Sequence, residues 1–426
     1  MKTRLDEKSK NVKLFPKYRQ ISRDFLFFYT INILFLIQVK NISASNIVLI
    51  DTFYALFVVI AQIPASFIID KIGRKKGMIL GNTLNILYLI LIMTSKNLYS
   101  LILAEIASSL AFSLKDIAEP AILNESIDLQ KEEKSKKFAR IQAKAISGYY
   151  LLSAISIAIS GFLFGINPYI PMFLALIIVF VSLIMSTRFI EPNLSGKLNK
   201  KSHVMKEVSL KDSIKFAFKS KRCRCLLMFS AVFFSIFTVL ATYEITLLED
   251  LKIDSKYIGI IFAILNIIAA ISSRKQNIFQ KKLGNRTLTF LGYAIIISCI
   301  IAGAASIFAS INIIFIMVII ISMYIIKYLT VGLYNVLIIK YLSNFTNAQI
   351  DTKIFAINSL VSSITAVCFG FVASRLLESL PIPIAMITFG MISFIIMSIV
   401  LFYMKNKVGL EPNMYSDFEL KYDKKV

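Results

Sequence analysis

Four ionisable residues of this sequence lie in or beside long apolar segments, where a charge is costly. Glu105, Asp116 and Glu119 belong to segment 98–121, and Lys327 lies near the middle of segment 311–338. An ionisable side chain at the centre of a bilayer costs roughly 2.5–3.5 kcal/mol on insertion scales, so it usually faces an internal cavity and has a function. A carboxylate there can bind and release a proton, and a nearby lysine can balance its charge. These residues therefore predict a proton-binding or substrate-binding site.

Helical geometry predicts which of these charges meet. On a helix with about 3.6 residues per turn, Glu105 and Asp116 are about 20° apart, and Glu119 lies about 40° to the other side. If the two segments are equivalent helices of a repeat, Lys327 is within about 6 Å in depth of Glu105 and about 10 Å of Asp116. If the fold also places these two helices around one cavity, we expect an ion pair between Glu105 and Lys327. Proton binding would open that pair, and a purely structural salt bridge is the alternative.

Other polar groups in apolar segments carry weaker predictions. Asn32 is expected either to contact a substrate or to hydrogen-bond a neighbouring helix. Lys115 faces away from Asp116 on the helix, and its long side chain is expected to reach the membrane surface. Asp51 and Glu244 lie near the ends of their segments and are expected at the interface with water.

The elements that carry these residues are predicted to be membrane-spanning helices. The chain has 426 residues, of which 57% are hydrophobic, and its mean hydropathy is +0.72. A bilayer core of about 30 Å needs roughly 20 apolar residues per helix, and only helices satisfy the backbone in long uninterrupted spans. Twelve spans are predicted, at residues 25–39, 47–69, 77–95, 98–121, 143–165, 169–190, 225–248, 257–278, 288–309, 311–338, 354–377 and 382–404.

The spans fall into two groups of six. We predict an N-terminal six-helix bundle over residues 1–190, a cytoplasmic linker over 191–224, and a C-terminal six-helix bundle over 225–426. Within the linker, residues 209–222 have the spacing of a basic amphipathic helix that lies on anionic headgroups, with a solvated linker as the alternative.

The distribution of basic residues predicts the orientation in the membrane. Of the 48 Lys and Arg residues, 41 lie in the termini and in loops on their side of the membrane, and five lie in the opposite loops. Because cytoplasmic loops carry the excess of Lys and Arg, both termini are predicted to be cytoplasmic. The net charge of +23 has this origin and does not indicate nucleic-acid binding. The richness in Lys, Ile and Asn is typical of an AT-rich bacterial genome, so the plasma (inner) membrane is expected.

The turn between the second and third spans carries a sequence signature. Residues 66–75 read Ser-x-x-x-Asp-Lys-x-Gly-Arg-Lys. This resembles the loop signature of the major facilitator superfamily, Gly-x-x-x-Asp-[Arg/Lys]-x-Gly-[Arg/Lys]-[Arg/Lys], with Ser in place of the first Gly. The equivalent turn of the second half, residues 281–286, keeps Gly284 but has lost the Asp.

The resemblance implies an all-α membrane protein whose 12 transmembrane helices form two pseudo-symmetric six-helix bundles. It also implies a gating role for Asp70, Gly73, Arg74 and Lys75. In the family, the acidic residue contacts the start of the eleventh helix, here near residues 351–355, and stabilises the outward-open state. The alternative, strongest for Lys75, is that these charges only set the topology.

A second short segment resembles one branch of the superfamily. Residues 121–126, Ala-Ile-Leu-Asn-Glu-Ser, resemble the Ala-Leu-Leu-Tyr-Asp-Ser of a bacterial efflux-type branch of the family. The Gly-Pro signature of proton-exchanging drug exporters is missing from the fifth span. The resemblance covers nearly the whole chain in architecture, and only the turn at residues 70–75 is specific at residue level.

The expected function is transport by alternating access, powered by an ion gradient, with protons as the expected ion and no bound cofactor. The sparse polar content of the spans favours export of a small amphipathic or hydrophobic compound. Uptake of a small polar or anionic solute, with Lys327 as counter-ion, is the alternative, and a membrane sensor without transport is a further one. The expected partners are a small-molecule substrate and the lipid bilayer, and the oligomeric state is not readable. The sequence has no arrangement of catalytic residues, no nucleotide-binding loop and no metal-ligand spacing, so an enzyme is not expected.

Overall fold

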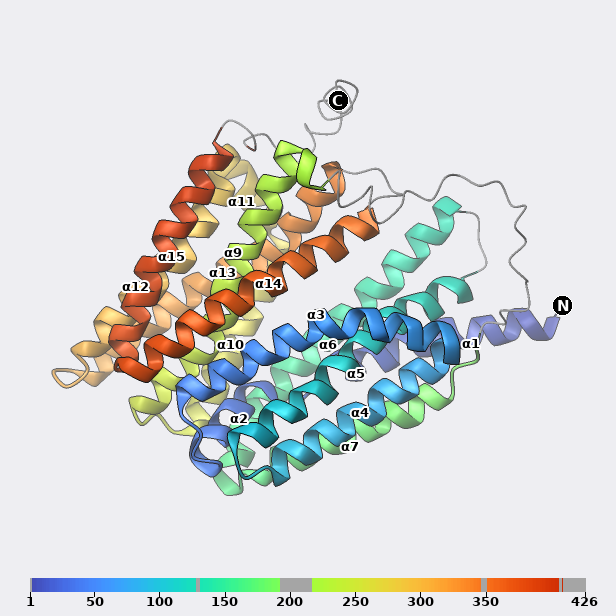
Figure 1. The fold of residues 1–426 in the computed structure, drawn as a ribbon, viewed down its shortest axis with the longest axis horizontal. Coiled ribbons are helices and arrows are strands. Elements are labelled where there is room, and N and C mark those ends of the chain that lie inside the picture. The colour runs from blue at the N-terminus through green and yellow to red at the C-terminus, as the bar shows by residue number, and fades with distance from the viewer. Residues whose placement is uncertain (1, 128–130, 192–216, 346–350, 406–407, 409–426) are drawn as a thin grey trace. The chain divides into compact units, whose positions relative to one another are not determined.

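The computed structural model describes residues 2–127, 131–191, 217–345, 351–405 and 408, and these residues form helices and short connections without a strand. They belong to two compact units (Figure 1). Unit 1 comprises Met1–Lys200 and Ile253–Ala263, and unit 2 comprises Lys201–Lys252 and Ile264–Val426. Most of the predicted amphipathic segment 209–222 lies outside the described residues.

The helices of unit 1 correspond to the predicted spans, except at the start. They are α1 (Lys2–Ser22), α2 (Tyr29–Leu34), the π-helical η1 (Phe35–Val39), α3 (Ala44–Ile72), α4 (Arg74–Thr94), α5 (Leu98–Ser126), α6 (Lys131–Ile166) and α7 (Tyr169–Thr187). Both α5 and α6 extend beyond their predicted spans.

Unit 2 repeats the pattern of long helices. Its elements are α9 (Lys221–Asp250), α10 (Ser255–Arg274), α11 (Gln276–Leu283), the 3₁₀ turn η2 (Gly284–Arg286), α12 (Thr287–Ile307), α13 (Ile313–Phe345), α14 (Asp351–Ser379) and α15 (Ile382–Met404). The first part of α10 belongs to unit 1.

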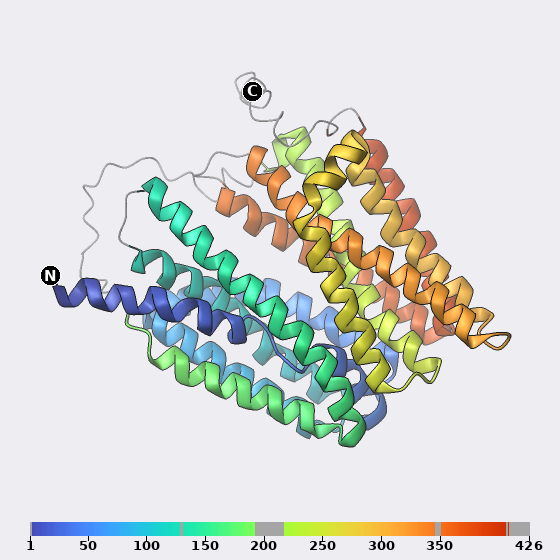
Figure 2. The same ribbon diagram turned by 180° about the vertical axis from the view of Figure 1, so that it is seen from behind.

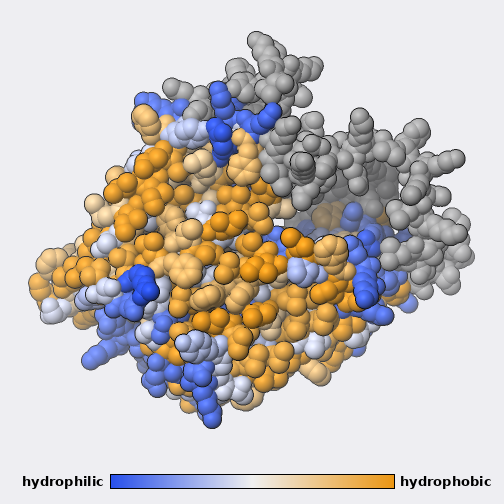
Figure 3. Space-filling model, viewed as in Figure 1, coloured by the Kyte–Doolittle hydropathy of each residue, from blue (hydrophilic) through white to orange (hydrophobic). Residues whose placement is uncertain are grey.

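Ten helices of the described chain are long and apolar enough to cross a membrane: α3, α4, α6, α7, α9, α10, α12, α13, α14 and α15. On the face drawn in Figure 3, hydrophobic side chains run along the helices and hydrophilic ones gather near helix ends. Of the two other predicted spans, α5 has the length but carries four charged residues between Glu105 and Glu119. The first predicted span is interrupted.

The first span is where the structure corrects the sequence-based prediction. Residues 25–39 were expected to form one helix, but the helical conformation stops at the end of α1 and resumes at Tyr29. Between them Phe27 has a φ of 64°, a conformation that bulky residues rarely adopt. The Asp24 side chain accepts a hydrogen bond from the backbone N–H of Phe25 at 3.1 Å. Such a local bond competes with the helical one and explains why the helix breaks at a charged residue.

The second half of α1, expected to be a basic cytoplasmic segment, is part of the protein interior. Figure 2 shows α1 running beside α6 and α7. Phe15 and Tyr18 of α1 are fully buried in a core cluster contributed by α1, α3, α4, α5 and α7 and the segments that follow them: Phe15, Tyr18, Ala65, Ile69, Met78, Leu114, Ala118, Ile122, Leu123, Ile127 and Phe189. The helix thus supplies buried apolar area that the short α2 and η1 cannot.

Two glycines bring α6 and the first part of α10 into backbone contact. A Cβ added at Gly161 would lie 2.6 Å from the carbonyl oxygen of Ser255 and 3.0 Å from the Cα of Gly259. The Ser255 hydroxyl donates to the Gly161 carbonyl at 3.2 Å. Close approach at small residues is a common way for membrane helices to associate.

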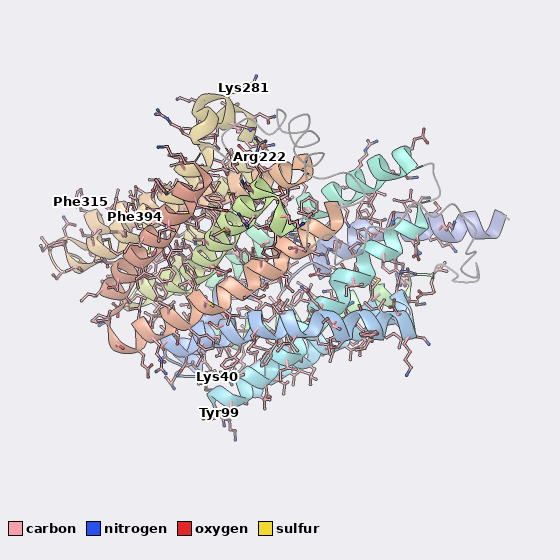
Figure 4. The ribbon with its side chains drawn as sticks, turned by 45° about the horizontal axis from the view of Figure 1, so that its top comes forward. Lys40, Tyr99, Arg222, Lys281, Phe315 and Phe394 are labelled. Atoms are coloured by element: carbon pink, nitrogen blue, oxygen red, sulfur yellow. The ribbon has the colours of Figure 1, made fainter. Side chains whose placement is uncertain are left out.

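The connection that follows η1 is held to the C-terminal end of α4 by hydrogen bonds. Lys40, which follows η1, donates from Nζ to the carbonyl oxygens of Met93 and Ser95, at 2.5 and 2.9 Å. Its ammonium group therefore caps the C-terminus of α4, where the helix dipole is negative. In Figure 4, Lys40 and Tyr99 lie at the same end of unit 1.

Candidate functional site

Unit 2 contains a buried ion pair between α9 and α13. Lys327 donates from Nζ to Glu244 Oε2 at 2.7 Å, and the exposed fractions of the two side chains are 0% and 3%. The Lys327 ammonium also lies over the rings of Phe237 and Tyr328, 5.2 and 4.8 Å from their centroids. The Tyr324 hydroxyl donates to the Glu244 backbone carbonyl at 3.2 Å. The ion pair is enclosed by aromatic rings and removed from solvent, so a change in charge at either partner would leave the other charge uncompensated.

This pair corrects two predictions. Glu105 was expected to be the partner of Lys327, but the carboxylate that Lys327 contacts is Glu244 of its own unit. Glu244 was expected at the water interface and is instead buried. The residue lies six positions from the end of α9, and that helix extends beyond the predicted span, to Asp250.

Glu105 is the buried carboxylate of unit 1. Its exposed fraction is 5%, and it accepts a hydrogen bond from the Tyr88 hydroxyl of α4 at 3.1 Å. Phe25 stacks on Tyr88 with a centroid separation of 5.4 Å, and Phe28 lies edge-on to the same ring at 5.8 Å. The segment that interrupts the first span thus covers the Glu105 site with aromatic rings.

The structure separates the two other carboxylates of α5. Glu119 is fully buried, and it accepts hydrogen bonds from the Tyr18 hydroxyl, at 2.9 Å, and from the Arg19 guanidinium. Asp116 has a side-chain exposed fraction of 66% and lies 3.5 Å from the same guanidinium. Of the three carboxylates predicted for α5, Glu105 accepts a hydrogen bond from Tyr88, Glu119 is bound by two residues of α1, and Asp116 is exposed.

Lys115 was expected at the membrane surface and is instead almost completely buried, with an exposed fraction of 1%. Its ammonium group donates to the backbone carbonyl of Ser22, the last residue of α1. Gly81 of α4 makes room for it, because a Cβ there would lie 2.7 Å from Lys115 Cγ. The lysine therefore caps the broken end of α1 from inside the unit.

Polar groups also gather at the break itself. The Tyr29 hydroxyl donates to Asp24 Oδ1, and the Arg23 guanidinium lies 5.4 and 5.8 Å from the ring centroids of Tyr149 and Tyr150. Asn32 follows the break; its backbone N–H donates to the Phe28 carbonyl at 2.6 Å, and its Oδ1 is buried without a hydrogen-bond partner among the described residues.

The turn between α3 and α4 has the backbone that its glycine predicts. Gly73 has a φ of 91° and ends α3 immediately before α4 begins. The backbone N–H groups of Arg74 and Lys75 donate to the two carboxylate oxygens of Glu191, at 2.9 and 2.7 Å. The Arg74 guanidinium forms a salt bridge with Glu125, near the C-terminus of α5. Two acidic residues therefore fix the turn within unit 1, while the side chain of Asp70 is exposed.

Sequence reasoning missed several of these residues. Glu191 was assigned to the linker and Glu125 received no role, and the α1 residues Tyr18 and Arg19 were placed outside the membrane. A signal for α1 was present, because residues 11, 15, 18, 22 and 25 recur at helical spacing through the basic segment and all are buried.

Comparisons with known proteins agree with this architecture. A sequence model described as Major Facilitator Superfamily matches residues 23–344. Among solved structures, a mutant of the nucleoside transporter NupG is 12% identical, with a TM-score of 0.71 over 93% of this chain and 99% of that chain. A D-xylose-proton symporter is 14% identical, with a TM-score of 0.66 over 96% of this chain and 98% of that chain.

A further solved structure, a POT family transporter in complex with 5-aminolevulinic acid, is 14% identical, with a TM-score of 0.63 over 94% of this chain and 95% of that chain. A comparison with curated proteins gave no significant match. At these identities the structural likeness is one of fold, and it confirms the predicted all-α membrane fold.

Proposed function

The chain belongs to the major facilitator superfamily, and we propose that it is a secondary transporter that works by alternating access and is driven by a proton gradient. Its cargo is a small molecule, and the driving ion reacts with carboxylates buried inside the helical units. No cofactor is required, because the gradient supplies the free energy.

The buried pair of Glu244 and Lys327 is the observation that carries this proposal. Removing one partner of a buried ion pair typically costs 3–5 kcal/mol, because the other charge is left uncompensated. A proton that binds Glu244 removes its negative charge, so the 2.7 Å contact with Lys327 loses its ionic component. The Lys327 ammonium must then find another anion or water. Protonation is thereby converted into a rearrangement between α9 and α13.

The same pair suggests two classes of cargo. The aromatic rings of Phe237 and Tyr328 beside the Lys327 ammonium favour a small amphipathic or hydrophobic compound, and we propose export of such a compound as the first candidate. An anionic solute is the second candidate, because a carboxylate or phosphate group could replace Glu244 as the partner of Lys327. An anionic cargo would favour uptake as the direction of transport. One of the solved structures of similar fold is named as a proton symporter.

The turn at residues 70–75 is proposed to control the cytoplasmic gate. Its backbone is fixed within unit 1 by Glu191 and Glu125, which leaves the exposed carboxylate of Asp70 available for a partner elsewhere. In the family this partner is the start of the eleventh helix, which corresponds to the start of α14. Thiol-labelling rates of cysteines placed at the cytoplasmic ends should rise in Asp70→Asn, and unchanged rates would contradict the gating role.

We place the protein in the plasma membrane of a bacterium, with both termini in the cytoplasm. The excess of Lys and Arg on one set of loops supports this orientation. A sensor without transport remains a distinct alternative, and the following experiment separates it from the transporter.

Transport by the purified chain in proteoliposomes with an imposed pH gradient tests the proposal. The panel should contain amphipathic cations, neutral hydrophobic compounds and small organic anions. We expect Glu244→Gln to abolish accumulation driven by the gradient while exchange of cargo across the membrane persists. The matched control is Glu378→Gln, which removes an exposed ion pair of the same unit, with Arg375, and should behave as the wild type.

Three results would overturn parts of the proposal. Accumulation that persists in Glu244→Gln would remove Glu244 from proton coupling. A transport rate of the wild-type chain that does not change with the pH gradient would exclude protons as the driving ion. Absence of transport for every class of compound, with the protein folded, would favour the sensor.

A further inference from the structure

Three buried side-chain oxygens on the adjoining helices α4 and α5 have no hydrogen-bond partner among the described residues. They are Asn82 Oδ1, Asn85 Oδ1 and Ser113 Oγ, and the exposed fractions of these residues are 0%, 2% and 5%. A buried acceptor without a partner costs about 1–3 kcal/mol. Buried water is the usual way in which proteins satisfy such groups. The orphaned oxygens therefore indicate bound water between these helices.

The two asparagines lie between two hydrogen-bonded groups of unit 1. On one side, the Tyr88 hydroxyl donates to Glu105. On the other side, Asn82 Nδ2 donates to the Tyr18 hydroxyl at 2.9 Å, and Tyr18 donates in turn to Glu119.

These groups form one row along α4. Asn82, Asn85 and Tyr88 follow one another at intervals of three residues, so they lie on one ridge of the helix that spans about 9 Å along its axis and turns by about 120° around it. With about 2.8 Å between hydrogen-bonded oxygens, at least two or three water molecules are needed to close this distance.

We propose that water held by Asn82, Asn85 and Ser113 completes a proton path inside unit 1, between Glu105 and the carboxylates at the cytoplasmic end of α5. The inference rests on the proposed proton-coupled function and names the route by which a proton reaches or leaves Glu105. The asparagines carry no proton themselves. Each water and each tyrosine hydroxyl accepts a proton from one neighbour and gives its own to the next, so one proton enters the row for each one that leaves.

The charges that face the path are balanced at its cytoplasmic end. Arg19, Lys115 and Arg23 contribute three positive charges, and Glu119, Asp116 and Asp24 contribute three negative ones. A proton that passes there meets no large net charge. Asp116, with a side-chain exposed fraction of 66%, shares the Arg19 guanidinium with Glu119 and is the more exposed of these two carboxylates.

The other end of the path is different. Glu105 accepts a hydrogen bond from Tyr88 of α4, and among the described residues the charged group that acts on its carboxylate is Asp51 of α3. A proton delivered to Glu105 is therefore held by a carboxylate whose surroundings are acidic or neutral.

Infrared spectroscopy of the full-length protein in lipid tests the path independently of transport. The carbonyl band of protonated Glu105 is assigned by its loss in Glu105→Gln, and its rise is followed after a rapid drop in pH. In Asn85→Leu the side chain has a similar volume but holds no water. We expect protonation of Glu105 to slow by roughly tenfold or more, the equivalent of one lost hydrogen bond in the barrier.

The matched variant is Asn85→Ser, which keeps an oxygen and leaves more room for water, and it should protonate at the wild-type rate. Asn85→Leu should fold, because leucine has a similar volume and replaces a polar side chain on the buried face of α4 by an apolar one. Equal protonation rates in the wild type and in a folded Asn85→Leu would overturn the path.

The two proposals fail in different ways. If Glu105 protonates slowly only in Asn85→Leu, but the pH gradient does not drive transport in the wild type, the path stands and the proposed proton-coupled transport falls. If the gradient drives transport equally well in the wild type and in Asn85→Leu, with equal protonation rates, the transport proposal stands and the path falls.

Discussion

Gly73→Ala should weaken the turn between α3 and α4 by two separate effects. The backbone of Gly73, with φ 91° and ψ 165°, lies in a region that essentially only glycine adopts. A Cβ at this position would also lie 3.2 Å from the carboxylate of Glu191. That carboxylate must shift, and it is the group that accepts the first two backbone N–H groups of α4.

The expected size of the effect follows from these contacts. Backbone strain of this kind costs about 1–3 kcal/mol. Weakening a hydrogen bond to a charged group adds about 1.5–3 kcal/mol. Gly73→Ala should therefore destabilise the turn by about 3–5 kcal/mol when both effects act.

Gly284 provides the matched control. It occupies the equivalent turn of unit 2, with φ 52°, and a Cβ there would have nothing within 4 Å. Gly284→Ala should show the strain alone, about 1–3 kcal/mol. The difference of about 2 kcal/mol corresponds to roughly a 30-fold larger opening constant for the turn at Gly73.

Hydrogen exchange of the peptide that covers the first turn of α4 measures this opening directly. In Gly73→Ala the amides of Arg74 and Lys75 should exchange much faster, and Glu191→Gln should reproduce part of the effect. The double variant should then cost less than the sum of the two single ones, because both disrupt the same hydrogen bonds. Unchanged exchange in Gly73→Ala, or full additivity, would refute the reasoning.

Three further predictions follow from the contacts of the described helices. Glu119→Gln should destabilise unit 1 by about 3–5 kcal/mol because it leaves Arg19 without its buried carboxylate partner, whereas Asp116→Asn, at an exposed carboxylate, should stay within about 0.5 kcal/mol. Thermal melting followed by circular dichroism compares the two variants, and equal melting temperatures would contradict the assignment. Gly161→Ala should force α6 away from a backbone carbonyl of α10, at a cost of about 1–3 kcal/mol, and cysteine cross-linking between the two helices should become slower. At the start of α10, a hydrogen bond from a backbone N–H, followed by a nearby lysine, lowers the pKa of Asp254. The charged carboxylate of Asp254 therefore stabilises the fold above the usual pKa of aspartate, and this stabilisation is lost as the pH falls through the lowered pKa of Asp254. Hydrogen exchange at the start of α10 should show this dependence on acid pH in the wild type and should lose it in Asp254→Asn.

The sequence alone determined the helical architecture and the turn at Gly73. A stretch of apolar residues must satisfy its own backbone in lipid, so length and hydropathy predict where the long helices lie. In α15 the predicted and observed limits agree to the residue, whereas α6 begins 12 residues before its predicted span. The glycine of the turn was readable because its backbone conformation is a local property.

Only the tertiary structure decided which charges meet and which are buried. Helical periodicity gives the direction of a side chain about its own axis, but it does not say which neighbour covers that direction. This is why Asp116 and Glu119, three residues apart, differ so strongly in exposure. It is also why Lys327 is paired with Glu244, which lies 83 residues away in the chain. The burial of α1 has the same origin, because the partners of Tyr18 and Arg19 come from a helix about 100 residues away in the chain.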